Sequence, residues 1–288
     1  MAGRFSEGRR PGILWSRTYR LAVPAVFLAT CLGAAHAAHA LSGEAPLSEC
    51  VADPAAERIG PLSPAKDMPA EFIAENGQRY HMTDIAFRPH NADNLPGMAD
   101  QDVQLHAIAA GPEDRWGRIP AWIVATPTHH DAALLQAVLV RQGAAMFAPL
   151  NANSACASAL LGAEIEARLA RRGLWDATPR YATWQPQALS AVAGTYAVAA
   201  GRVISLGKTT RTRYLNFGRY WKTDVTATVP AGQDDAFTAA LAGRGVEWPD
   251  LIGQAVEIRG FVTIHDGPHI ELRHPAQLRV LKPEAARP

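Results

Sequence analysis

Residues 114–127 read DRWGRIPAWIVATP, in which a polar turn leads into an apolar run. The run from Ile119 to Thr126 predicts a strand, and the run from Val103 to Ile108 predicts its partner, because both are rich in apolar and β-branched residues. A turn that begins Gly111-Pro112-Glu113-Asp114 separates the two runs. We therefore predict an antiparallel pair of strands, with Arg118 immediately before the second strand.

Short strands and amphipathic helices are predicted on both sides of this pair. Residues Glu71 to Ile85 alternate around an Asn-Gly turn, which is typical of a hairpin. From Asp131 the apolar residues follow a helical period, so we predict a helix with Asp131 as its N-cap and Gly143 at its end. A second helix is predicted over residues 155–172. The segment 71–176 is thus expected to be a β unit covered by helices.

The C-terminal part of the chain, residues 194–282, predicts a second β unit. Its predicted strands are residues 194–206, 213–217, 224–229, 256–264, 269–273 and 277–281, with a helix over residues 232–243. Several short strands with one inserted helix are typical of a small barrel of the oligonucleotide/oligosaccharide-binding (OB) type. Residues 41–70 predict an N-terminal arm, and residues 177–193 predict a linker. The expected fold class is therefore mostly β, with helices and two small barrels.

Residues 1–40 are typical of a cleavable secretory signal peptide. Five arginines and one glutamate precede an apolar run from Leu21 to Ala35, and Ala38-His39-Ala40 follows. We predict cleavage after Ala40 and a periplasmic or secreted chain, with an uncleaved anchor as the alternative. The apolar run has 15 residues, which is short for a membrane span, and no later segment is apolar enough to be one. Cys50 and Cys156 would remain, which suggests a disulfide in an oxidising compartment; two free thiols are the alternative.

Several stretches of the first unit occur in a familiar order. Residues 114–118 read DRWGR, residues 121–124 read AWIV, residues 135–145 read LQAVLVRQGAA, and residues 163–175 end in Gly-Leu-Trp. Over roughly residues 70–176, this order and spacing resemble the staphylococcal nuclease (thermonuclease) family. The resemblance implies a five-stranded barrel capped by helices, and a Ca²⁺-dependent activity that hydrolyses phosphodiester bonds.

Two motifs of the second unit also resemble a known module. Residues 214–218 read YLNFG, and residues 267–275 read GPHIELRHP. They are similar to a module that follows nuclease-like domains in exported proteobacterial proteins. Those relatives carry a cysteine near the mature N-terminus and another at the start of the last helix, as do Cys50 and Cys156. The resemblance therefore also implies a disulfide between these two residues.

The catalytic positions of the nuclease family are mostly substituted in this chain. Family members use two arginines, a Glu that handles the attacking water, and Asp side chains that bind Ca²⁺, an ion that prefers hard oxygen ligands. By the resemblance, His81 replaces the first arginine, Ala86 a metal-binding Asp and Pro89 the Glu, whereas Arg118 keeps its identity. Loss of the metal ligand or of the base alone typically costs roughly 10²–10⁴-fold in rate. We therefore predict a degenerate site, in which Arg118 is a catalytic relic or a brace of the barrel.

Three other carboxylates could restore hydrolysis through a shift in strand register. Asp67 or Glu71 could replace the first Asp of the family, and Asp84 could replace the second, if their side chains pointed into one cleft. The alternative function is thus a weak metal-dependent nuclease that uses Arg118, displaced carboxylates and Ca²⁺. With a degenerate site we expect no cofactor, and the chain would be a binding or structural module.

The net charge of +1, from 28 basic and 27 acidic residues, hides unlike parts of the 288-residue chain. Residues 41–190 hold 11 basic and 17 acidic residues, a net of −6, which disfavours phosphate binding. Residues 191–288 hold 12 basic and 9 acidic residues, a net of +3. There, basic and aromatic residues alternate as they do in single-strand nucleic-acid binders. The candidates are Lys208, Arg211, Arg213, Tyr214, Arg219, Tyr220, Trp221 and Lys222.

Two further hypotheses concern residues of the C-terminal unit. Tyr214 could belong to the barrel core and the charged residues to a solvated edge. Three histidines around the last hairpin, His265, His269 and His274, suggest a zinc site, but no Cys or carboxylate stands at matched spacing, so we predict no metal site.

Overall fold

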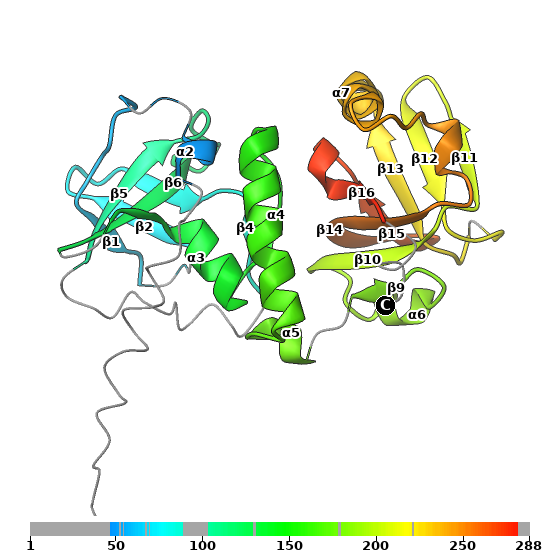
Figure 1. The fold of residues 1–288 in the computed structure, drawn as a ribbon, viewed down its shortest axis with the longest axis horizontal. Coiled ribbons are helices and arrows are strands. Elements are labelled where there is room, and N and C mark those ends of the chain that lie inside the picture. The colour runs from blue at the N-terminus through cyan, green and yellow to red at the C-terminus, as the bar shows by residue number, and fades with distance from the viewer. Residues whose placement is uncertain are drawn as a thin grey trace, which may run out of the picture.

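Two β-barrels lie on either side of one long helix in the computed structural model of the chain (Figure 1). The structure describes residues 47–51, 53, 55–66, 68, 70–88, 103–128, 131–177, 180–220 and 222–281. The predicted signal peptide lies outside these residues. Among the described helices, none combines the length and the apolar character that a membrane span requires.

The first barrel is built from five strands. They are β1 (Leu62–Pro64), β2 (Glu71–Ala74), β3 (Arg79–Met82), β5 (Val103–Ala109) and β6 (Arg118–Pro127). Their order is β1-β2-β3-β6-β5, in which β3 and β6 are parallel and the other pairs are antiparallel. A bridge between Ile59 and Ala107 joins the start of the β1 segment back to β5 and closes the barrel. The predicted hairpin and the predicted strand pair are confirmed.

The second barrel has the same strand order as the first. Its elements are β10 (Tyr196–Arg202), β11 (Ser205–Lys208), β12 (Thr212–Asn216), β13 (Thr226–Pro230), α7 (Ala231–Ala242), β14 (Ala255–His265), β15 (Gly267–Glu271) and β16 (Leu278–Val280). The order is β11-β12-β13-β15-β14-β10, with β13 and β15 parallel. Because β10 and β11 are successive halves of one bent segment, the barrel closes on itself. The expectation of a mostly β protein with OB-type barrels is confirmed, and β12, β13 and β15 correspond to β2, β3 and β6.

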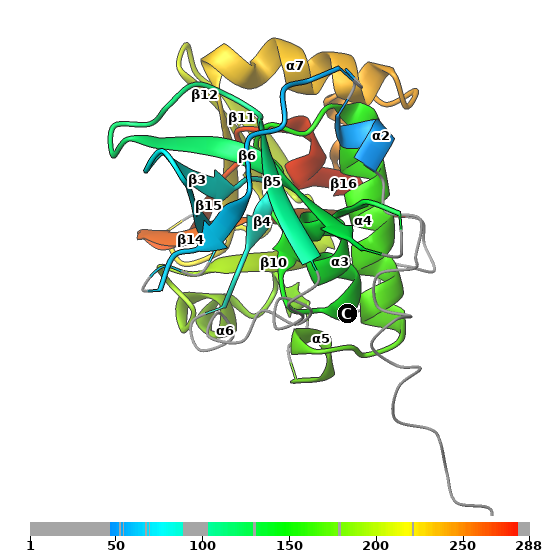
Figure 2. The same cartoon turned by 90° about the vertical axis from the view of Figure 1, so that its left-hand side faces the viewer.

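Helices of the first unit cover one side of its barrel. The helix α3 (Leu135–Gln142) packs against α4 (Ser154–Leu169), and Figure 2, which faces the first barrel, shows the two side by side. The prediction of a helix capped by Asp131 is wrong: β7 (Ala133–Leu134) pairs with β6 first, and Leu134 is the N-cap residue. Pairing with β6 holds these residues extended, so the helical period begins later than the apolar pattern suggests. The second predicted helix, over residues 155–172, is confirmed but ends at Leu169.

The segments that suggested an arm and a linker carry structure of their own. In the predicted arm, residues 41–70, α2 (Leu47–Cys50) and β1 are part of the first unit. The predicted linker, residues 177–193, begins at the end of α5 (Leu174–Ala177). It contains β9 (Tyr181–Ala182), which pairs with β10, and α6 (Pro186–Ser190). Leu189 of α6 is fully buried in the core of the second barrel. Residues 180–193 are thus packed against that barrel. Burial of Leu189, with Tyr181 and Val192 beside it, holds the segment there although its composition is rich in Pro and Ala.

The two units meet at an interface with an apolar and a charged part. The apolar part joins Met146 and Trp175 of the first unit to Tyr196 and Val198 of β10, beside the short pair β4 (Ile85–Ala86) and β8 (Met146–Phe147). Beside it, Arg259 of β14 is 2 % exposed and forms ion pairs with Glu164 of α4 at 3.1 Å and with Glu257 of β14 at 2.6 Å. Its Nη1 also donates a hydrogen bond to the carbonyl oxygen of Phe147. These contacts fix one barrel against the other.

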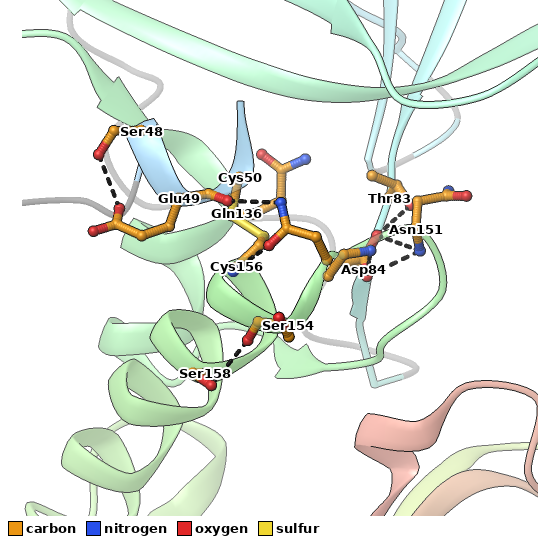
Figure 3. Close-up of a disulfide and its surroundings, with 12 residues drawn as sticks. Ser48, Glu49, Cys50, Thr83, Asp84, Gln136, Asn151, Ser154, Cys156 and Ser158 are labelled. Carbon is orange, nitrogen blue, oxygen red and sulfur yellow. Dashed lines mark hydrogen bonds between the residues drawn. A yellow bond between two sulfur atoms is a disulfide. The ribbon is translucent and has the colours of Figure 1, made fainter. Parts of the chain in front are cut away.

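The predicted disulfide between Cys50 and Cys156 is present (Figure 3). Both cysteines are buried, and they belong to the same apolar cluster as Trp122 and Phe147. The bond ties α2 to the first turn of α4, which begins at the N-cap Asn153. The Asn153 side chain strengthens this tie, since its Nδ2 donates to the Glu49 carbonyl oxygen.

Candidate functional site

Three charged residues meet on the outer face of the first barrel. Alternation along β2 and β3 sends Phe72 and Tyr80 into the core and places Glu71 and Arg79 on the opposite face. Arg118, the first residue of β6, lies directly opposite Arg79 in the parallel register of β3 and β6. Three neighbouring strands thus bring Glu71, Arg79 and Arg118 together.

Arg118 is held between two carboxylates. Its Nη1 donates to Glu71 Oε1 at 2.6 Å, and its Nε and Nη2 both donate to Asp114 Oδ2, at 3.0 and 2.8 Å. The turn that ends at Arg118 holds Asp114 in place, because Oδ1 accepts hydrogen bonds from the backbone N–H groups of Trp116 and Arg118. The positive charge of the Arg118 guanidinium is therefore balanced by two carboxylates of the protein itself.

Glu71 is shared by two arginines and is only 3 % exposed. Arg79 forms an ion pair with its other oxygen, Oε2. Burial raises the pKa of Glu71, but hydrogen bonds from Arg118 and Arg79 outweigh burial and lower this pKa below its ordinary value. In the same way burial raises the pKa of Asp114, yet the hydrogen bonds from Arg118 hold it at about 2. Both carboxylates are ionised at neutral pH.

His81 lies next to this group, opposite Glu71 in the register of β2 and β3. Burial lowers its pKa, and the positive charge of Arg118 lowers it further. The buried Nδ1 atom of His81 has no hydrogen-bond partner among the described residues. The imidazole of His81 is therefore neutral at pH 7.

Asp84 has a structural task in the first unit. It is 2 % exposed, and its carboxylate accepts hydrogen bonds from the backbone N–H groups of residues 150, 151 and 152 and from the Thr83 hydroxyl. Figure 3 shows part of this arrangement, in which Asn151 faces Thr83 and Asp84. Its oxygens are thus directed at the loop before α4 and not at Arg118. Of the other positions, Ala86 is buried at the interface between the barrels, and Asp67 and Pro89 lie outside the described residues.

Of the two carboxylate candidates that the structure describes, it brings Glu71 to Arg118 and directs Asp84 elsewhere. It adds Asp114, which the sequence placed in the turn but did not single out. Arg115 and Arg118 lie over the ring of Trp116 at 4.0 and 4.8 Å from its centroid. Among the described residues, no three His, Cys, Asp or Glu side chains are grouped closely enough to hold a metal ion, and this includes the three histidines near the last hairpin.

The fold and this face define a class of protein. It is an OB-type barrel capped by helices, and Arg118 is the first residue of its strand β6. Residues 82–177 match a family described as staphylococcal nuclease homologue. The chain therefore carries a domain of the staphylococcal nuclease family. A comparison with curated proteins found no match.

The basic and aromatic candidates of the second barrel point to different sides. Lys208 and Arg213 form ion pairs with Asp234 of α7, and Arg213 also lies 4.3 Å from the centroid of the Trp248 ring. Tyr214, the next residue along β12, points to the opposite face, as strand alternation requires. Tyr220 is 75 % exposed, Arg211 and Arg219 are also exposed, and Trp221 lies outside the described residues. Lys208 and Arg213 thus do not share a surface with Tyr214.

Tyr214 instead lines an open groove of about 640 Å³ on the outer face of the second barrel. The other lining residues come from β11, β12, β13, the end of β14, β15 and the turn between β14 and β15: Gly207, Thr212, Asn216, Thr226, Thr228, His265, Asp266, His269 and Glu271. Sequence reasoning named Tyr214, His265 and His269 for other reasons and missed the rest of this set. Polar residues at alternate positions of the predicted strands were a usable signal. These residues meet because their strands are neighbours in the sheet, and the strand order cannot be predicted from local sequence patterns.

Proposed function

We propose that the chain is an exported binding protein in which the nuclease-like domain no longer hydrolyses phosphodiesters. The observation that carries this proposal is the pairing of Arg118 with Glu71 and Asp114. A phosphoryl oxygen needs an arginine whose donors are free to turn toward it. Here the donors of Arg118 are directed at carboxylates of the protein, and a phosphate would also meet the negative charges of those carboxylates.

Export is the second part of the proposal. The signal-like residues 1–40 support it, and so does the buried disulfide, because disulfides persist mainly in oxidising compartments. Mass spectrometry of the chain purified from the cell envelope fraction of a bacterial host tests this. A mass that begins at Leu41 supports export with cleavage, whereas a cytoplasmic chain that retains Met1 contradicts it.

The alternative function is a weak metal-dependent nuclease. It is favoured by one observation: two carboxylates, Glu71 and Asp114, do stand beside Arg118. If Ca²⁺ displaced the arginines from these carboxylates, a metal ion and a phosphate-binding arginine would share one face. No three carboxylates or histidines meet there among the described residues, so such a site would depend on substrate oxygens and water to complete the coordination.

A cleavage assay on the chain from residue 41 onward separates the two functions. With Ca²⁺ and single-stranded DNA, we expect no cleavage above the protein-free rate for the wild type, for Glu71→Gln or for Arg118→Ala. Arg115→Ala is the matched control, because Arg115 is exposed in the same turn and contacts neither carboxylate in the pairs described. Cleavage by the wild type and by Arg115→Ala that falls roughly 10²-fold or more in Arg118→Ala and Glu71→Gln would establish the alternative.

A further inference from the structure

The groove of the second barrel lies on the face that corresponds to the Arg118 site of the first. The strands β12, β13 and β15 occupy the places of β2, β3 and β6, with the same parallel pair in the middle of the site. In the first barrel this face is closed by ion pairs between Glu71, Arg79 and Arg118. In the second barrel the equivalent face is open. In OB barrels this face is the one that takes oligonucleotides or oligosaccharides.

Strand alternation explains why the groove is polar while the barrel beneath it is apolar. Leu215, Ala227 and Ile270 point inward and are fully buried. Their neighbours Tyr214, Thr228 and His269 point outward into the groove. The groove is thus a built surface of the sheet and not a gap between loops.

Gly207 keeps one part of the groove open. It lies directly opposite Tyr214 in the register of β11 and β12. A Cβ atom at Gly207 would lie 3.5 to 3.9 Å from the Cβ, Cδ2 and Cγ atoms of Tyr214, so any longer side chain there would lie over the tyrosine. The glycine therefore leaves the tyrosine accessible to a flat ligand.

Two of the hydrogen-bonding side chains in the groove, His269 and Thr228, are held in fixed positions. His269 lies between two hydroxyls, with Nε2 at 2.8 Å from Thr228 Oγ1 and Nδ1 at 3.1 Å from Thr263 Oγ1. Its ring also packs edge-on against that of His265, with the centroids 5.1 Å apart. Burial and the neighbouring His265 lower the pKa of His269, so its imidazole is neutral at pH 7. Side chains fixed in this way need little ordering when a ligand binds.

The charge of the groove decides between the two ligand classes of OB barrels. Among the described residues, its lining contains two carboxylates, Asp266 and Glu271, and no Lys or Arg. Glu271 Oε1 pairs with Arg273, which is exposed and is not part of the lining. Nucleic-acid sites need positive charge along the phosphate backbone, and a carboxylate opposes it. Sugar hydroxyls, in contrast, are donors that bind strongly to carboxylate oxygens, and the flat face of a sugar ring can pack on an aromatic ring.

We propose that this groove binds an uncharged oligosaccharide, with a sugar ring on Tyr214 and hydroxyl groups bound by Asn216, Thr226, Asp266 and Glu271. The proposal rests on the proposed function in treating the chain as a binding protein, and it names the site and the ligand class. The basic residues Lys208 and Arg213 are not part of this proposed site, because both form ion pairs with Asp234.

Calorimetric titration of the chain from residue 41 onward tests this proposal. The probes are neutral linear oligosaccharides of the malto-, cello-, xylo- and N-acetylchito-series, each at millimolar concentration, and a single-stranded oligothymidylate. We expect at least one oligosaccharide to bind. Tyr214→Ala and Gly207→Leu should each weaken that binding at least about tenfold. Tyr220→Ala, which removes a more exposed aromatic residue outside the groove, should leave it unchanged.

Three results would overturn the proposal. They are no binding by any of the oligosaccharides, oligosaccharide binding that survives in both groove variants, and oligothymidylate binding that is lost in those two variants. Gly207→Leu adds bulk at the surface without removing a contact, so it keeps the test valid if Tyr214→Ala fails to fold. The cleavage assay above concerns the first barrel, so failure of the proposed function would be seen there, independently of this titration.

Discussion

At the scale of single residues, the same type of side chain has opposite tasks in the two barrels. Glu71 closes the face of the first barrel by pairing with Arg79 and Arg118. Glu271, on the corresponding face of the second barrel, is 40 % exposed and pairs only with the exposed Arg273 among the described residues. Burial makes the difference, because a buried carboxylate must be paired whereas an exposed one can remain available to a ligand.

Asp234 provides a pH-dependent prediction at this scale. Hydrogen bonds from Arg213 lower its pKa to about 2; burial opposes this shift and the hydrogen bond from Lys208 adds to it. Because the pKa in the folded state is below that of the unfolded chain, the stabilisation is complete above pH ~4 and is lost as the pH falls toward about 2. We expect Asp234→Asn to lower the unfolding free energy by about 1–2 kcal/mol at pH 7.

Urea denaturation at a series of pH values measures this effect. The stabilities of the wild type and of Asp234→Asn should converge as the pH falls from about 4 to about 2. Asp235→Asn is the control, because Asp235 is exposed on the same helix and should change stability by less than about 0.5 kcal/mol at any pH. A difference between wild type and Asp234→Asn that does not depend on pH would show that the ion pairs contribute nothing.

At the scale of elements, the end of α4 explains the Gly-Leu-Trp motif. Gly143 and Gly173 both have positive φ angles, of 70° and 53°. A Cβ atom at Gly173 would lie 2.4 Å from the carbonyl oxygen of Gly143, so only glycine allows the end of α3 and the turn after α4 to approach this closely. Leu174 then donates its backbone N–H to the same oxygen and buries its side chain with Trp175. In this chain the motif thus serves the packing of α3 against the end of α4.

The disulfide joins α2 to the other end of α4 and gives a second prediction. Cys50 and Cys156 are 106 residues apart, so the bond restricts a large loop in the unfolded chain. We expect the double variant Cys50→Ser, Cys156→Ser to lose about 2–5 kcal/mol of unfolding free energy. Denaturation of the oxidised wild type, the reduced wild type and the double variant measures this loss. Equal stability of all three would contradict a structural role for the bond.

At the scale of the whole molecule, the ion pairs around Arg259 connect the two barrels. Glu257 binds Arg259, Arg168 and Arg279, and Glu164 binds Arg259 and Arg168, so that α4 and β14 share one charged network. The pKa of Glu257 is lowered far below its ordinary value: burial would raise it, but the positive charges of Arg259 and Arg168 outweigh burial. The network is thus ionised throughout the physiological range.

Removal of the central arginine should separate the barrels. Arg259→Met leaves Glu164 and Glu257 buried with fewer partners, and we expect a loss of about 3–5 kcal/mol in unfolding free energy. Arg273→Met is the control, because Arg273 is 72 % exposed and its loss should cost less than about 1 kcal/mol. Limited proteolysis should cut Arg259→Met between the barrels faster than it cuts the control. Equal stability and equal cleavage of the two variants would show that the apolar contacts alone hold the interface.

The sequence by itself determined most of the secondary structure and the family of the first barrel. Strand alternation, turn glycines and helical periods are local, so the hairpin, the strand pair, α4 and α7 could be read from neighbouring residues. The Trp-Gly-Arg and Gly-Leu-Trp motifs indicated the nuclease family for the same reason, since each is a short run with a fixed conformation. The disulfide was also predicted, because only two cysteines follow the signal-like segment.

Only the tertiary structure decided how these parts are used. It placed Glu71 and Asp114 on Arg118, turned Asp84 toward the loop before α4, and directed Arg213 and Tyr214 to opposite faces. It also gathered the groove from strands that are neighbours in space but not along the chain. The physical reason is that strand pairing and burial depend on the whole barrel, so whether a charged residue is a ligand group, a brace or a surface residue depends on the neighbours that folding gives it.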